Sequence, residues 1–139
     1  MKEIMAIVRM NRTGATKKAL VESGVAGFTA VKVLGRGKPL EDPQAIEERR
    51  QKLLALAVDD VNDDEETERQ VTTFLDGSRP FPRRLFMVLA HDEDVPRIVD
   101  AITRANKSEN AAGDGAIFIL PVADAVRVRT GESGEAAIW

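Results

Sequence analysis

The chain has 139 residues, a net charge of −3 and 43% hydrophobic residues, which suits one folded domain with one core. It contains no cysteine, so disulfide bonds and thiolate metal sites are excluded. No signal peptide opens it and no apolar run approaches the roughly 20 residues that cross a membrane, so we expect a soluble, cytoplasmic protein without membrane insertion. The weakly acidic charge gives no support for nucleic-acid binding.

The first third of the chain predicts a strand, a helix and a second strand. Residues 4–8 form a short apolar run that is typical of a central strand. Residues 15–23 predict a helix that follows Thr13 and stops at Gly24. Residues 28–34 alternate and are rich in β-branched side chains, which favours a strand.

A segment at residues 37–82 is far too long for a hairpin connection. Within it, Asp42-Pro43 is typical of a helix N-cap followed by proline at the first helical position, and residues 45–58 predict a helix. Residues 59–68 carry seven carboxylates without EF-hand spacing, which favours a solvated acidic face over a Ca²⁺ site or a catalytic base. A second short helix is predicted at residues 65–75.

The last third of the chain predicts two strands around a helix, then a short strand. Residues 85–90 and 117–122 predict the two strands. Apolar residues at spacings of three and four predict a helix over 95–105, capped by Asp92 or Asp94.

Residues 125–129 predict a short fifth strand. The order β-α-β-β-α-β is the ferredoxin-like plan, an α+β fold in which right-handed connections place both helices on one face of the sheet. The other face needs cover, which a trimer would supply.

Two motifs near the end of the chain indicate a phosphate site. Gly113-Asp114-Gly115 predicts a tight turn whose backbone N–H groups approach a phosphate closely, because glycine has no Cβ. Arg127 and Arg129 would lie on one face of a strand, and guanidinium suits bidentate phosphate contacts. The alternative for these arginines is an exposed strand face.

Both ends of the chain resemble the PII signal-transduction family. The resemblance covers residues 1–38 and about 82–138 and includes MKEIMAIVRMN, LGRGK and GDGAIFILPVADAVRVRTGESGEAAI. PII proteins are trimeric sensors of adenine nucleotide and 2-oxoglutarate, and residues 37–82 correspond to their T-loop, which contacts partners. MKEIMAIVRMN and LGRGK are most similar to the nitrogenase-associated branch, which switches nitrogenase off.

The resemblance implies a nucleotide site between subunits for ATP or ADP. The residues themselves offer no nucleophile–base pair and no metal constellation that would indicate catalysis. The implied nucleotide residues are Thr29, Gly35, Gly37, Lys38, Arg83, Gly113, Asp114, Gly115, Arg127 and Arg129. The implied 2-oxoglutarate residues are Arg9, Lys38 and Arg83. The plain alternatives are a glycine-rich strand exit at 35–38, an ordinary strand threonine at Thr29, and surface cations at Arg9 and Arg83.

The chain departs from the PII pattern at several positions. Pro39 replaces a glutamine that helps to hold the Mg²⁺ between ATP and 2-oxoglutarate, Ala116 replaces a lysine that contacts phosphate, and Lys38 stands where the family prefers arginine. Tyrosine is absent, which excludes uridylylation on a T-loop tyrosine. The lone His91 is expected to be structural, and Trp139 is either a free tail or an anchor on a neighbouring subunit.

These expectations describe a regulatory binding protein rather than an enzyme, a homotrimer or a mixed trimer with a paralogous subunit. Nucleotide would change the conformation of residues 37–82, which would contact a nitrogenase component. Pro39 and Ala116 favour an alternative, a divergent nucleotide sensor that regulates a transporter or another metabolic enzyme. A third hypothesis is an enzyme that cleaves nucleotide through the acidic residues 59–68.

Overall fold

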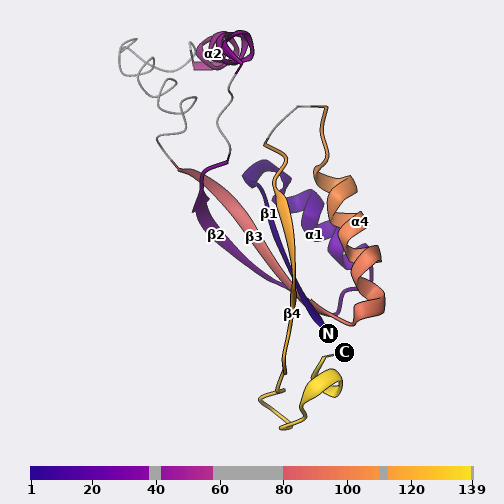
Figure 1. Cartoon of the computed structure of the whole chain (residues 1–139). Coiled ribbons are helices and arrows are strands. Elements are labelled where there is room, and N and C mark those ends of the chain that lie inside the picture. Colours follow the sequence, from indigo (N-terminus) through magenta and orange to yellow (C-terminus); the bar gives the residue numbers. More distant parts are fainter. Residues whose placement is uncertain (38–41, 58–79, 110–112, 139) are drawn as a thin grey trace. The chain divides into compact units, whose positions relative to one another are not determined.

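The computed structural model describes residues 1–37, 42–57, 80–109 and 113–138. The chain forms two compact units, one of Met1–Val33 with Pro82–Trp139 and the other of Leu34–Phe81. The strands are β1 (Lys2–Arg9), β2 (Thr29–Gly35), β3 (Phe81–Ala90) and β4 (Ala116–Pro121), and the helices are α1 (Thr13–Glu22), α2 (Pro43–Ala57) and α4 (Val95–Asn106) (Figure 1).

The four strands form one sheet in the order β2-β3-β1-β4. β1 is antiparallel to both of its neighbours: Arg9 lies opposite Arg83 on β3, and Ile7 lies opposite Ala116 on β4. With a helix after β1 and another after β3, this strand order confirms the ferredoxin-like α+β fold.

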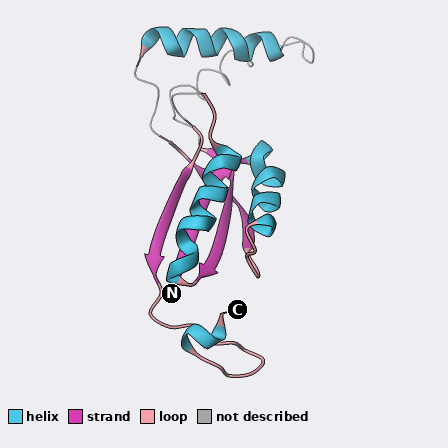
Figure 2. Ribbon diagram, turned by 90° about the vertical axis from the view of Figure 1, so that its right-hand side faces the viewer, coloured by secondary structure: helices cyan, strands magenta, loops and turns pink. Residues whose placement is uncertain are grey.

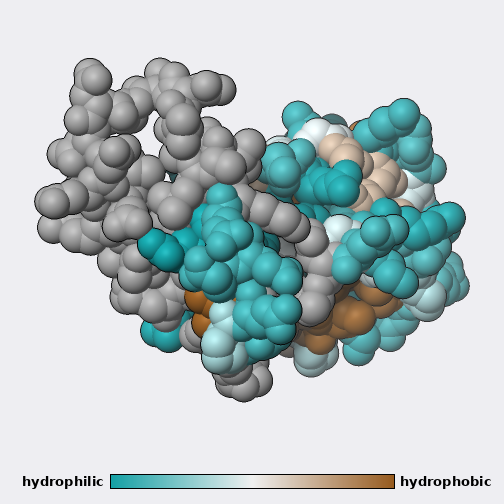
Figure 3. Space-filling view, turned by 90° about the horizontal axis from the view of Figure 1, so that it is seen from above, coloured by the Kyte–Doolittle hydropathy of each residue, from teal (hydrophilic) through white to brown (hydrophobic). Residues whose placement is uncertain are grey.

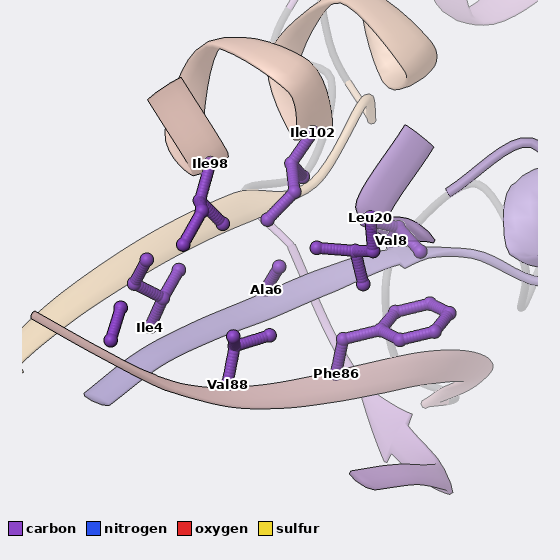
Figure 4. Close-up of a cluster of buried hydrophobic side chains, with 9 residues drawn as sticks. Ile4, Ala6, Val8, Leu20, Phe86, Val88, Ile98 and Ile102 are labelled. Carbon is purple, nitrogen blue, oxygen red and sulfur yellow. The ribbon is translucent and has the colours of Figure 1, made fainter. Parts of the chain in front are cut away.

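Both helices cover one face of this sheet, as right-handed connections require (Figures 1 and 2). Ile4, Ala6 and Val8 of β1 are buried beneath them, and α1 packs beside α4. The core comprises Ile4, Ala6, Val8, Leu20, Phe86, Val88, Ala90, Ile98 and Ile102 (Figure 4). The rings of Phe28 and Phe86 close one end of it with an edge contact at 5.6 Å between centroids.

The other face of the sheet is apolar and stays accessible. The register places Met5 between Met87 and Phe118, one from each neighbouring strand. Phe118 is 52% exposed and Leu89 is 45% exposed. Seen from above, a patch of brown, hydrophobic residues is visible at the lower edge of the view (Figure 3). Such an exposed apolar face is a feature of interaction surfaces.

The predicted helix 15–23 is confirmed as α1, which starts two residues earlier at Thr13. Gly24 follows its end with φ of +77°. The predicted strand 85–90 is confirmed within the longer β3.

The predicted cap of α4 is confirmed in its position, at Asp94, but not as a hydrogen bond. Asp92 belongs to a short 3-10 turn, and Asp94 occupies the N-cap position without a capping hydrogen bond from its side chain. The carboxylate of Asp94 pairs instead with Arg97 one turn into the helix. A cation at this spacing competes with the backbone for the carboxylate oxygens.

The unit Leu34–Phe81 holds α2, which confirms the helix predicted at 45–58. The Asp42 carboxylate accepts a hydrogen bond from the Gln44 N–H at 3.1 Å, and Pro43 is the first helical residue, as the N-cap pattern predicts. The second helix, predicted at 65–75, lies outside the described residues. None of the helices that the structure describes is long and apolar enough to cross a membrane.

Candidate functional site

Two arginines meet at the end of the sheet where β1 finishes and β3 begins. Arg9 and Arg83 are register partners on the two strands. Arg9 Nη2 lies 3.0 Å from a carboxylate oxygen of Asp114 and donates to the carbonyl oxygen of Asn106 at 3.3 Å. Arg83 Nη1 donates to the carbonyl oxygen of Gly113 at 3.3 Å. Residues far apart in the sequence therefore converge here; we call Arg9, Arg83 and the turn 113–115 the arginine cluster.

Asp114 organises the turn between α4 and β4. Its two carboxylate oxygens accept hydrogen bonds from the Ser108 hydroxyl at 2.6 Å and from the Ser108 N–H at 2.7 Å. The Ser108 hydroxyl, its N–H and the positive charge of Arg9 lower the pKa of Asp114. The ionised carboxylate thus accepts hydrogen bonds from Ser108. The arginine cluster contains two guanidinium groups and one carboxylate.

The two glycines of the turn differ in the space around their Cα atoms. Both have positive φ, +98° at Gly113 and +112° at Gly115, a region that side chains disfavour. A Cβ on Gly115 would lie 2.0 Å from the Ile7 carbonyl oxygen, whereas a Cβ on Gly113 would meet none of the described residues within 4 Å. Gly115 therefore lets the turn lie against β1, and Gly113 leaves open space beside the two arginines.

The residues predicted on β2 do not lie together. Thr29 begins this strand and Gly35 ends it, so they stand at opposite ends of one element. Thr29 is exposed, Gly35 is half-buried and Gly37 is exposed. Lys38 and Pro39 lie outside the described residues.

The predicted fifth strand at 125–129 was wrong. Only an isolated bridge joins Val126 to Ser133 in this part of the chain, because the segment folds back on itself and the Arg127 N–H donates to the Glu132 carbonyl at 2.8 Å. The Arg127 guanidinium pairs with the Glu132 carboxylate at 2.8 Å and donates to the carbonyls of Ala136 and Ala137. Arg127 thus closes this C-terminal segment, while Arg129 is exposed.

The C-terminal segment lies at the opposite end of the sheet from the arginine cluster (Figure 1). The Met1 amino group pairs with Asp92 at 2.7 Å and with Glu135 at 2.9 Å. Glu135 also lies 2.5 Å from Nδ1 of His91. Within one chain, Arg127 and Arg129 are therefore separated from the turn 113–115.

Two residues that hold the site, Asn106 and Ser108, were missed by the sequence analysis. Asn106 follows Ile102 by four residues, so it is a polar residue on the apolar stripe of α4; this signal was present in the sequence. Ser108 bonds across a turn, and no periodicity reveals such a contact.

The part of the chain that the structure describes holds no group of three or more His, Asp or Glu side chains able to bind a metal ion. The acidic stretch at residues 59–68 lies outside it.

Comparisons with known proteins identify relatives of this chain. The family model described as "Nitrogen regulatory protein P-II" matches residues 1–132. The chain is 38% identical over 138 residues to the "Nitrogen fixation nifHD region GlnB-like protein 2" of Methanobacterium ivanovii, and 99% of each chain is covered. It is 34% identical to the protein of the same name from Methanothermococcus thermolithotrophicus, over 99% of this chain and 98% of the relative. It is 33% identical to the "Nitrogen regulatory protein P-II" of Cereibacter sphaeroides, over 99% of this chain and all 100% of the relative.

Proposed function

Since the chain belongs to the nitrogen regulatory protein P-II family, we propose that it senses ATP or ADP and controls a nitrogenase component through residues 37–82. The names of its relatives, which place them in the nitrogen-fixation region, support this choice of target. Its role is regulatory rather than catalytic, and its compartment is the cytoplasm. In this proposal residues 1–139 are one P-II domain, and residues 37–82 are its T-loop.

The observation that carries the nucleotide proposal is the convergence of Arg9, Arg83 and Gly113. The cluster brings two guanidinium groups to the turn, and no described residue lies within 4 Å of a Cβ built on Gly113. Guanidinium groups and backbone N–H groups in such a turn are suited to phosphate oxygens. The proposed nucleotide site also includes Thr29, Gly35, Gly37, Lys38, Asp114 and Gly115.

The proposed site is shared between subunits. Arg127 and Arg129 contribute from a second copy, because one chain holds them at the opposite end of the sheet from the turn 113–115. The exposed apolar face around Phe118 would form the inner surface of a trimer, either of identical subunits or with a paralogous subunit. The proposal includes no contact with nucleic acid and no membrane insertion.

2-Oxoglutarate is the second proposed effector, and Arg9, Arg83 and Lys38 would meet its carboxylates. Pro39 offers no side-chain oxygen for the Mg²⁺ that helps to hold 2-oxoglutarate in the family. We therefore propose that 2-oxoglutarate binds weakly, or through a geometry without this metal bridge.

A second candidate is a nucleotide sensor whose target is a transporter or another metabolic enzyme. Ala116 favours it, because this exposed position at the start of β4 carries no cation for a phosphate. The two candidates share the nucleotide site and differ in the target alone.

Thermal unfolding with ATP or ADP tests the nucleotide site. Ligand at about 100 times its Kd should stabilise the protein by roughly 2.7 kcal/mol. Arg83→Gln should remove most of this gain. Arg104→Gln, which changes an exposed arginine on the surface of α4, is the matched control and should retain it. Absence of any gain with either nucleotide would refute the proposal.

Nitrogenase assays test the target. Inhibition of purified nitrogenase by the trimer, dependent on nucleotide, would support the first candidate. Nucleotide binding without any effect on nitrogenase activity, or any complex with its components, would favour the second.

A further inference from the structure

Ser108 is the residue through which the end of α4 contacts the turn 113–115. The helix closes with a hydrogen bond of 2.8 Å from the Lys107 N–H to the Thr103 carbonyl oxygen. The backbone of Lys107 then leaves the helical region, with φ of −56° and ψ of 132°. Ser108 follows directly and bonds to Asp114, six residues further along the chain. All of these residues belong to the unit that holds the core.

Both donors of Ser108 bind the Asp114 carboxylate. The serine hydroxyl donates to one oxygen at 2.6 Å, and the serine N–H donates to the other at 2.7 Å. Arg9 Nη2 lies 3.0 Å from the oxygen that accepts the hydroxyl bond. The Asp114 side chain is only 28% exposed, so each of its oxygens is held by a protein group and its orientation is fixed.

A carboxylate within a turn that binds phosphate needs such partners. Phosphate and carboxylate carry like charges and repel each other. The repulsion is smallest when protein donors offset the charge of the carboxylate. Ser108 supplies two of these donors, and Arg9 supplies a guanidinium. The side chain of Asp114 is thus committed to the protein, while the backbone N–H groups of a glycine-rich turn are the groups suited to phosphate oxygens.

We propose that Ser108 is a positioning residue of the nucleotide site. It holds the Asp114 carboxylate, and through this carboxylate it sets the backbone of the turn 113–115 for phosphate oxygens before the ligand arrives. A turn that is already ordered raises affinity, because binding then loses less conformational entropy. The inference rests on the proposed function, since it takes this turn as a phosphate contact. It adds a residue that acts on the ligand only through Asp114.

Calorimetry with ATP on the full chain tests this role. Ser108→Ala removes the hydroxyl donor and should weaken ATP binding about tenfold. Ser108→Thr keeps a hydroxyl at the same position and should restore the affinity, which a loss of stability alone would not predict. Ser23→Ala is the matched control, because it also removes a hydroxyl at a helix end, where Ser23 donates to the Leu20 carbonyl at 2.8 Å. It should bind ATP as wild type does. Equal affinity of Ser108→Ala and wild type would overturn the inference.

Inorganic tripolyphosphate tests whether the effect concerns the phosphates. Added to ¹⁵N-labelled wild type, it should shift the NMR signals of the amides of residues 113–115. Its affinity should fall in Ser108→Ala by about the same factor as that of ATP. A loss with ATP alone, with tripolyphosphate affinity unchanged, would overturn the inference by placing the effect at another part of the nucleotide.

Asp114→Glu gives a second variant that decides the matter if Ser108→Ala does not fold. It keeps the negative charge but extends the side chain by one methylene group, so it should weaken ATP binding as Ser108→Ala does. The double variant should lose little more than either single variant, because residues that act as one unit are not additive. Wild-type affinity in Asp114→Glu would overturn the inference. A wild type that binds neither ATP nor ADP would instead refute the proposed function, and the inference with it.

Discussion

The guanidinium of Arg9 and the carboxylate of Asp114 lie 3.0 Å apart. This ion pair joins the end of β1 to the turn that precedes β4. Ser108 holds the same carboxylate from the end of α4. The turn is therefore fixed from two sides, by a strand and by a helix end. Its geometry should respond to any change in the charge of Asp114.

Acid should weaken this arrangement in a defined direction. The Ser108 hydroxyl, the Ser108 N–H and Arg9 lower the pKa of Asp114 from its ordinary value of 3.8. A carboxyl group whose pKa is lower in the folded than in the unfolded protein stabilises the fold at pH values above its unfolded-state pKa. This stabilisation is lost as the pH falls through the folded-state pKa. The wild type should thus exceed Asp114→Asn in stability at neutral pH, and the difference should shrink below about pH 4.

Urea unfolding at a series of pH values measures this difference. Asp100→Asn, which removes a carboxylate from the exposed surface of α4, is the control and should not reproduce the pattern. A difference between wild type and Asp114→Asn that stays constant down to pH 2 would contradict the assignment.

The two glycines of the turn give a second prediction. Gly113→Ala should cost about 1–2 kcal/mol, the typical penalty of a side chain at positive φ. Gly115→Ala should cost clearly more, because its Cβ would lie 2.0 Å from the Ile7 carbonyl oxygen and β1 and β4 would have to separate locally. Equilibrium unfolding in urea compares the two variants. Similar losses would show that the backbone relieves the clash cheaply.

The fold could be predicted from the sequence because its elements follow clear periodicities. The apolar run of β1 predicted a strand, and the apolar residues of α4, spaced three and four apart, predicted a helix. The Arg127-Val128-Arg129 alternation is equally regular, yet it forms no strand, because strand formation needs a pairing partner and the segment folds back on itself. Local pattern carries no information about such long-range pairing.

The site was harder to predict than the fold. The convergence of Arg9 with Asp114 depends on strand order. The family resemblance assigned Arg9 to a 2-oxoglutarate site and Asp114 to a nucleotide site, and it predicted no contact between them. Asp94 occupies the predicted cap position but makes no capping hydrogen bond, and its carboxylate pairs with Arg97. The predicted cap at Asp42 is confirmed, since its carboxylate accepts a hydrogen bond from the Gln44 N–H.

The proposed trimer predicts a specific effect on the open face of the sheet. Phe118→Glu would place a charge at the centre of the interface, where an unpaired buried charge costs several kcal/mol, and should yield monomers. Val21→Glu is the matched control, because Val21 is 66% exposed on α1, away from that face. Sedimentation velocity at micromolar concentration distinguishes the outcomes. A stable monomer for the wild type would disprove the trimer.

Deletion of residues 42–76 tests the role of the T-loop. Every residue of the core cluster belongs to Met1–Val33 or Pro82–Trp139, so the deleted protein should fold, assemble and bind nucleotide with an affinity within a few-fold of wild type. Target binding should be lost. Calorimetry with ATP and a pull-down of the target measure the two properties. Loss of nucleotide binding would assign the deleted residues to the scaffold instead.

The closed C-terminal segment has a spectroscopic consequence. The chain contains one tryptophan, Trp139, and no tyrosine, and Trp139 directly follows the segment that Arg127 closes through the carbonyls of Ala136 and Ala137. Its fluorescence emission therefore reports on this end of the chain alone. A change in emission that precedes the loss of far-UV circular dichroism would reveal local opening of the segment in the native protein. The protein thus carries a single tryptophan ten residues after Arg129, and its emission can be followed without a label.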